Sequence, residues 1–156
     1  MEIISDFITS VHKALEEIDP NYESYTGLVI AGTHAPTVES VEQQIQKIKE
    51  AREAGTPTLL ICHGQQVGAI EYARNVKGIK DATSEEYGTG TFVVKKRDAL
   101  KVGLHEGESW WSYYEVVIDV EYPPHFFATP SHPEYTSSIF SPHPLLVQFL
   151  TLCKNQ

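Results

Sequence analysis

The chain has 156 residues and a mass of 17.5 kDa, a length that predicts one domain around a single core, residues 1–156. Hydrophobic residues make up 41% and charged residues 21%, which excludes disorder as the main state. A net charge of −9 argues against a nucleic-acid partner, and the lack of a long apolar run argues against a membrane partner. Two cysteines and no secretory signal pattern lead us to expect a cytoplasmic protein.

The first half of the chain alternates between helix and strand patterns. Apolar residues at helical spacing predict helices over residues 5–18, 40–54 and 65–76. Two apolar runs predict strands buried on both faces, GLVIAG at 27–32 and TLLIC at 58–62. Ser40 and Gln43 have the spacing of a capping box, which marks the start of the second helix. The order of elements favours a parallel α/β sheet.

The second half of the chain has a different character. Further strands are predicted at 91–96 and 114–120, a strand with a loop is predicted over 126–135, and Pro144 begins a short closing helix. Before residue 5 only Ile3 and Ile4 could form the strand with which such a sheet usually opens, so we expect the N-terminal strand to be missing. A sheet without its first strand exposes an edge, and we expect the protein to cover it as a homo-oligomer.

Cys62 is the first candidate catalytic residue. It ends a buried strand, and Gly64 and a helix follow, which is the context of a nucleophile elbow. The helix N-terminus would favour the thiolate, and the N–H of His63 could point at an oxyanion. The alternative is a buried structural cysteine. Leu60 stands where the usual elbow has glycine, which departs from the pattern.

His132 and Glu134 could complete a catalytic triad with Cys62. A thiol nucleophile needs an imidazole base, and the base needs an orienting carboxylate. On an extended segment, His-x-Glu places both side chains on the same side, and Pro133 would stiffen that segment. The alternative is a surface histidine that has a glutamate beside it by chance.

Three segments together resemble a known family. LLICHGQQVGAIEYARNVKGIKDATSEE, at 59–86, resembles the C-terminal glutamine amidotransferase domain of the CTP synthases, whose pattern reads GICLGMQ and then AVIEFARNV. YYEV at 113–116 and SHPEYTSS at 131–138 resemble the RYEV and HPEF segments of that domain. The similarity covers roughly residues 27–150.

The resemblance implies a flavodoxin-like class I glutamine amidotransferase fold, with a mostly parallel central sheet and helices on both faces. It also implies hydrolysis of glutamine through a cysteine thioester, with ammonia passed to a synthase subunit in trans for CTP biosynthesis. Cys62 would be the nucleophile, His132 the base and Glu134 its orienting group. Gln66 matches a glutamine that contacts the substrate, and Glu86 matches the glutamate that binds the substrate α-amino group.

The pocket departs from the family pattern at several positions. The family's oxyanion loop reads PGGFG, whereas this chain has Gly32 followed by Thr33, whose Cβ restricts the backbone. Tyr113 replaces the arginine that pairs with the glutamine α-carboxylate. His63 replaces an apolar residue beside the nucleophile, although Gly64 is kept.

Two other functions remain open at this stage. One is a catalytically impaired binding or regulatory module, and the other is a thiol hydrolase of another small amide. A zinc site is a third alternative, because the resemblance brings His34, Cys62, His63, His132 and Glu134 to one crevice. No compact ligand spacing such as CxxC or HExxH occurs, so we expect neither a metal nor a cofactor.

Overall fold

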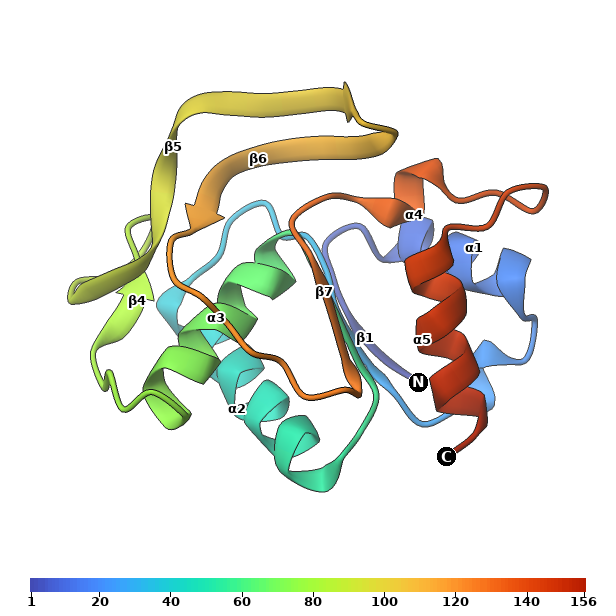
Figure 1. Cartoon of the computed structure of the whole chain (residues 1–156), viewed down its shortest axis with the longest axis horizontal. Coiled ribbons are helices and arrows are strands. Elements are labelled where there is room, and N and C mark those ends of the chain that lie inside the picture. The colour runs from blue at the N-terminus through green and yellow to red at the C-terminus, as the bar shows by residue number, and fades with distance from the viewer.

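Four short strands form the centre of the molecule, in a computed structural model that describes residues 1–156 (Figure 1). They are β1 (Glu2–Ile4), β2 (Leu28–Ile30), β3 (Thr58–Ile61) and β7 (Phe126–Thr129), and they lie in this order across the sheet. Every neighbouring pair is parallel. The predicted α/β fold with a parallel sheet is therefore confirmed.

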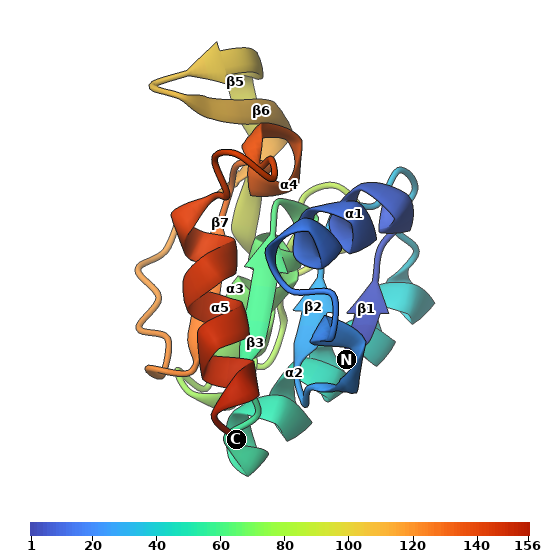
Figure 2. The ribbon, with the colours of Figure 1, turned by 90° about the vertical axis from the view of Figure 1, so that its right-hand side faces the viewer.

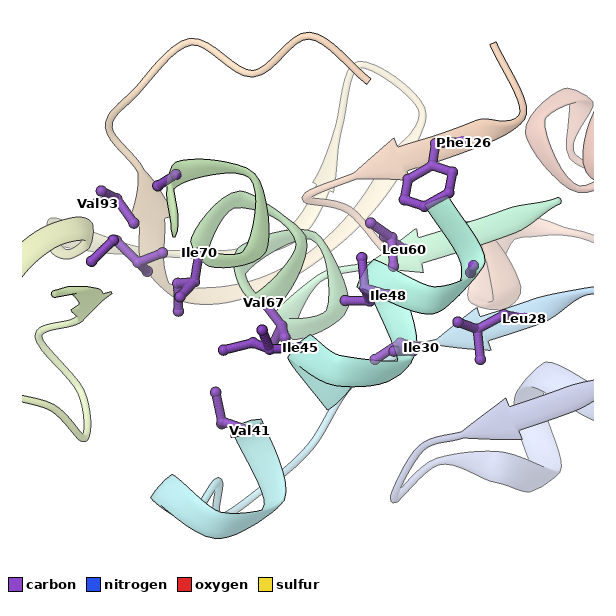
Figure 3. Packing of buried hydrophobic residues seen from close by; sticks show 14 residues of the cluster. Leu28, Ile30, Val41, Ile45, Ile48, Leu60, Val67, Ile70, Val93 and Phe126 are labelled. Carbon is purple, nitrogen blue, oxygen red and sulfur yellow. The ribbon is translucent and has the colours of Figure 1, made fainter. Parts of the chain in front are cut away.

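Helices cover both faces of this sheet. α1 (Ile8–Ile18) and α5 (Pro144–Lys154) pack on one face, and Figure 2 shows them side by side in front of the strands. α2 (Val38–Ala54) and α3 (His63–Asn75) pack on the other face. Figure 3 shows apolar side chains of these two helices gathered against Leu60 and its neighbours on the sheet. None of the helices combines the length and the apolar character that a membrane crossing requires.

The second helix begins earlier than its sequence signal indicated. Thr37 is the N-cap, because its hydroxyl oxygen accepts a hydrogen bond from the Ser40 N–H at 3.1 Å. The Ser40 hydroxyl in turn accepts from the Thr37 N–H at 3.1 Å, which completes the capping box. The pairing of Ser40 with Gln43 was therefore wrong. The chain is extended up to Thr37, and the helix begins at Val38. Ser40 is therefore the third residue of the helix rather than its N-cap.

A first strand is present, contrary to the expectation that it is missing. The Glu2 N–H donates to the Gly27 carbonyl, and the Ala31 N–H donates to the Ile4 carbonyl, each at 2.9 Å. Three residues are enough because β1 is an edge strand and bonds to β2 alone. The expectation of a homo-oligomer was based on a missing first strand, and β1 is present. Self-association stays a prediction. A 3-10 turn, η1 (Tyr22–Ser24), lies between α1 and β2.

A long hairpin replaces the separate strands that were predicted in the second half. β5 (Thr91–His105) and β6 (Glu108–Val116) are antiparallel, and β4 (Ala82–Ser84) pairs with the first of them. The predicted bounds of 91–96 and 114–120 were wrong, because a ribbon open to solvent needs no apolar alternation along its length. In Figure 1 the hairpin arches over one end of the four-strand sheet.

The segment that carries His132 and Glu134 is a helical turn and not part of a strand. β7 ends at Thr129, and α4 (Pro133–Thr136) follows with His132 as its N-cap. The strand predicted within 126–135 is therefore confirmed at Phe126–Thr129, whereas the extended conformation expected around His132 and Glu134 was wrong. Proline favours the first position of a helix because its φ angle is already helical, so the proline expected to stiffen a strand begins α4 instead.

Candidate active site

Cys62 lies on a sharp backbone turn between β3 and α3. Its φ of 53° and ψ of −109° fall in a region that residues with a side chain rarely adopt. The Cys62 N–H donates to the Thr129 carbonyl at 2.9 Å, which ties the turn to β7. Cys62 is also the N-cap of α3, so its side chain lies at the positive end of the helix dipole. This is the strand–turn–helix geometry of a nucleophile elbow.

Gly64 allows the turn to be this tight. A Cβ at this position would lie 1.9 Å from the carbonyl oxygen of Ile30, which is closer than any real contact. Only glycine lets the first turn of α3 rest directly on β2. The elbow therefore depends on a glycine two residues after Cys62, and Leu60, two residues before Cys62, is a fully buried core residue.

His132 and Glu134 form a buried pair beside the cysteine. His132 Nδ1 lies 2.7 Å from a Glu134 carboxylate oxygen, and the two residues are only 3% and 6% exposed. Burial alone would lower the pKa of His132, but hydrogen bonds with Cys62 and Glu134 outweigh it and raise that pKa to about 10. The imidazole is therefore held between the thiol and the carboxylate. The His132 N–H donates to the Ser109 carbonyl at 2.7 Å, which fixes the backbone.

A cavity of about 380 Å³ opens in front of this pair, outside the carboxyl ends of the strands. Eight of the ten site residues predicted from the sequence line it: Gly32, Thr33, Cys62, His63, Gln66, Glu86, Tyr113 and His132. The other two lie behind the wall. Glu134 is behind His132, and Gly64 is under the first turn of α3. The structure thus brings together residues that are up to 100 positions apart in the sequence.

The loop at Gly32 and Thr33 is held by Asp6, which the sequence analysis missed. The Asp6 carboxylate accepts the Thr33 hydroxyl at 2.6 Å and the His34 N–H at 2.7 Å. These two hydrogen bonds lower the pKa of Asp6. The N–H of Thr33 has no hydrogen-bond acceptor. A Cβ on Gly32 would lie 3.0 Å from the Phe7 ring and 3.4 Å from the His132 ring, so the loop fits closely beside the histidine.

His63 is buried without a polar partner. It is 4% exposed, and neither ring nitrogen makes a hydrogen bond. Burial lowers the pKa of His63 to about 4, so the ring is neutral at pH 7. His34 packs on Phe7, with ring centroids 4.4 Å apart. No group of three or more His, Cys, Asp and Glu side chains in residues 1–156 is arranged to hold a metal ion.

Gln66, Glu86 and Tyr113 complete the predicted set around the cavity. The Gln66 side-chain amide donates to the Tyr114 carbonyl at 3.5 Å, while its buried carbonyl oxygen has no partner. Glu86 lies at the rim, where desolvation raises the pKa of its carboxyl group. Tyr113 projects from β6 and is 48% exposed.

The hairpin forms the roof of the cavity. The Trp111 carbonyl oxygen accepts a hydrogen bond from the Cys62 thiol, with a sulfur–oxygen distance of 3.7 Å. Phe7 and Tyr135 also line the cavity, and Tyr135 stacks on His132 with ring centroids 5.2 Å apart. Tyr135 directly follows the His-Pro-Glu motif, which is a signal that could have identified it.

A family model named "Glutamine amidotransferase class-I" matches residues 6–115, which is more than two thirds of the chain. The chain is 29% identical to a CTP synthase of Bdellovibrio bacteriovorus, in an alignment that covers 90% of this chain and 36% of that protein. It is 31% identical to a CTP synthase of Methanoculleus marisnigri, over 73% of this chain and 31% of that protein. The chain spans about a third of the length of these curated relatives.

A solved structure is similar over the whole chain. It is the Trypanosoma brucei CTPS glutaminase domain with bound acivicin, which matches with a TM-score of 0.76 and 18% sequence identity. The match covers 100% of this chain and 95% of that structure. At this level of identity the likeness establishes the fold, and it agrees with the class I glutamine amidotransferase fold predicted from the sequence.

The burial of His63 leads to a prediction about how the free energy of unfolding changes at acid pH. An unfolded chain protonates histidine near pH 6.5, whereas folded His63 stays neutral down to about pH 4. The unfolded state therefore binds more protons in this window, and the stability that depends on His63 falls as the pH falls. Between pH 7 and pH 4 the free energy of unfolding should fall by about 3 kcal/mol more in the wild type than in His63→Gln.

Urea unfolding at a series of pH values measures this difference. His105→Gln is the control, because His105 is exposed at the end of β5 and should follow the wild-type profile. Parallel stability profiles for the wild type and His63→Gln would show that His63 is not held neutral.

Proposed function

This chain belongs to the class I glutamine amidotransferase family, and we propose that it hydrolyses the side-chain carboxamide of glutamine, or of a similar small amide, through a thioester at Cys62. The observation that carries the proposal is the continuous contact from Cys62 through His132 to Glu134, at the wall of a cavity large enough for a small molecule. A buried structural cysteine would need neither the strained elbow nor the buried carboxylate–imidazole pair.

In the proposed first step, the Cys62 thiolate attacks the carboxamide carbon. The resulting oxyanion would accept hydrogen bonds from the N–H of His63 and from the unpaired N–H of Thr33. Protonated His132 then gives its proton to the leaving nitrogen, the carbon–nitrogen bond breaks, and ammonia leaves a thioester on Cys62. Glu134 keeps the imidazole oriented and stabilises its positive charge.

In the proposed second step, water takes the place that ammonia left. His132 removes a proton from the water, the hydroxyl attacks the thioester carbon, and the carbon–sulfur bond breaks. The products are a carboxylic acid and the restored pair of thiolate and imidazolium. The Trp111 carbonyl oxygen, which lies 3.7 Å from the Cys62 sulfur, would be free to accept an N–H of the bound carboxamide when Cys62 is a thiolate.

The relatives are named CTP synthases, so we propose that the ammonia serves an amination of the CTP synthase type. The acceptor reaction would be carried out by a synthase subunit in trans. This assignment rests on the names of the relatives, whereas the hydrolytic step rests on residues of this chain.

Ammonia release tests the hydrolytic function. The purified protein is incubated with L-glutamine at several concentrations, and free ammonia is followed with a coupled glutamate dehydrogenase assay. We expect turnover that Cys62→Ala abolishes and Cys153→Ala preserves, because Cys153 is a buried residue of α5 outside the cavity. The same assay is run with other primary amides. If every amide gives the rate of Cys62→Ala, the protein is a non-hydrolytic module.

Asp6 generates a second prediction about this activity. Asp6→Ala releases the Thr33 hydroxyl and the His34 N–H, so the oxyanion loop loses its anchor. We expect kcat to fall about tenfold or more, since a misplaced oxyanion donor acts on the transition state. The rate of Cys62 alkylation by iodoacetamide, which forms no oxyanion, should change little.

Asp19→Ala is a matched control for Asp6→Ala. Asp19 also accepts one hydroxyl, from Tyr25 at 2.7 Å, and one backbone N–H, from Asn21 at 3.0 Å, but it lies away from the cavity. Equal losses of kcat in the two variants would show that the effect of Asp6 is on general stability.

A further inference from the structure

We propose that the cavity accepts a primary carboxamide that bears a free amino group but no free carboxylate, such as a glutamine whose α-carboxyl group is in an amide bond. The inference rests on the hydrolytic function proposed above and names its substrate class. Three features of the cavity carry it: the lack of a cation for a carboxylate, an unpaired carboxylate for an amine, and neutral buried groups that fit an amide.

No lysine or arginine lines the cavity. The residues that do are Phe7, Gly32, Thr33, His34, Cys62, His63, Gln66, Glu86, Trp111, Ser112, Tyr113, Tyr114, His132 and Tyr135. The positive charge of His132 is already balanced by Glu134 at 2.7 Å and by the adjacent Cys62. A substrate carboxylate would therefore lose its hydration without gaining a charged partner, which is unfavourable.

Arg97 is the guanidinium that contacts the cavity wall from outside, and it is paired with hairpin residues. Its Nε donates to the Ser112 hydroxyl at 3.0 Å, and its Nη1 donates to the Glu115 carboxylate at 3.0 Å. Its central carbon also lies 5.6 Å from the centroid of the Trp110 ring. The charge of Arg97 is thus neutralised within the hairpin, and none of its atoms lines the cavity.

Glu86 provides the site for an amine. Glu86 lines the cavity, and its carboxylate has neither an ion pair nor a hydrogen bond with the protein; its one hydrogen bond to a side chain is from its backbone N–H to the Ser84 hydroxyl. Desolvation without a cation is the cause that raises the pKa of Glu86. A substrate ammonium would supply that cation, and the rings of Tyr113 and Tyr114 on the same wall favour a positive charge.

Two neutral polar groups in the cavity wall suit an amide better than a carboxylate. His63 is neutral, and its two ring nitrogens offer one donor and one acceptor without a partner. The side-chain carbonyl oxygen of Gln66 is a buried acceptor that needs a donor. An amide has an N–H for that oxygen, whereas a carboxylate would place one acceptor against another.

Three small molecules separate the requirement for a free amine from the requirement that the carboxylate be masked. L-glutamine has both the amine and the carboxylate, L-glutamine N-methylamide has the amine and a masked carboxyl group, and N-acetyl-L-glutamine has the carboxylate without the amine. Each contains one primary carboxamide, so ammonia reports hydrolysis at the side chain. We expect kcat/KM for the N-methylamide to exceed that for glutamine about tenfold or more, and N-acetyl-L-glutamine to be the poorest substrate.

Two pairs of variants test the residues behind this preference. Tyr113→Arg adds a cation to the cavity and should reverse the order in favour of free glutamine, while Leu104→Arg, on an exposed part of the hairpin outside the cavity, should not. Glu86→Gln should remove most of the advantage of the N-methylamide over N-acetyl-L-glutamine. Glu85→Gln is its control, because Glu85 accepts the Lys96 N–H at 2.8 Å and does not line the cavity.

Calorimetric binding to Cys62→Ala separates this inference from the proposed function. Tighter binding of the N-methylamide than of glutamine, together with no ammonia release by the wild type, would uphold the inference and overturn the hydrolytic function. Cys62-dependent hydrolysis with equal or greater kcat/KM for free glutamine would uphold the function and overturn the inference. Failure of Cys62→Ala to bind the N-methylamide also overturns the inference.

Discussion

The close approach of Gly64 to the carbonyl oxygen of Ile30 is the constraint on which the site depends. A side chain at position 64 would meet that oxygen at 1.9 Å, so α3 can begin directly against β2 only because the residue is glycine. This contact leaves no room for a gradual transition from strand to helix. Cys62 therefore takes a positive φ of 53°, and its sulfur points out beyond the carboxyl ends of the strands at the start of a helix dipole.

The opposite wall of the cavity comes from the second half of the chain and is tied down separately. Glu108, at the start of β6, lies 2.8 Å from His143 and accepts the Ser131 hydroxyl at 3.0 Å. The Ser109 carbonyl accepts the His132 N–H at 2.7 Å. The same short stretch of the hairpin thus holds the roof and the backbone of His132. This coupling places Trp111 over the thiol without a covalent link between the two halves.

The sequence predicted the parts of the site that have a local signature. Cys62 follows an apolar strand and precedes a helix, and the His-Pro-Glu motif contains both His132 and Glu134. The cysteine and the pair could therefore be found from short segments. The hairpin could not, because its strands are exposed ribbons whose composition follows no alternation. Asp6 was missed for a similar reason, since its role depends on a loop 27 positions later in the chain. The absence of lysine and arginine from the cavity lining became visible only when the lining residues were assembled.

The proposed hydrolysis depends on a thioester between Cys62 and the carbonyl carbon of a primary amide. This thioester can be trapped by acid quenching during turnover with L-glutamine N-methylamide or L-glutamine, followed by intact-mass spectrometry and peptide mapping. We expect a mass gain equal to the substrate less ammonia, located on the peptide that contains Cys62. A mass gain equal to the whole substrate, or an adduct on Cys153, would contradict this mechanism. Hydrolysis that Cys62→Ala abolishes but that leaves no adduct on Cys62 of the wild type would also contradict it.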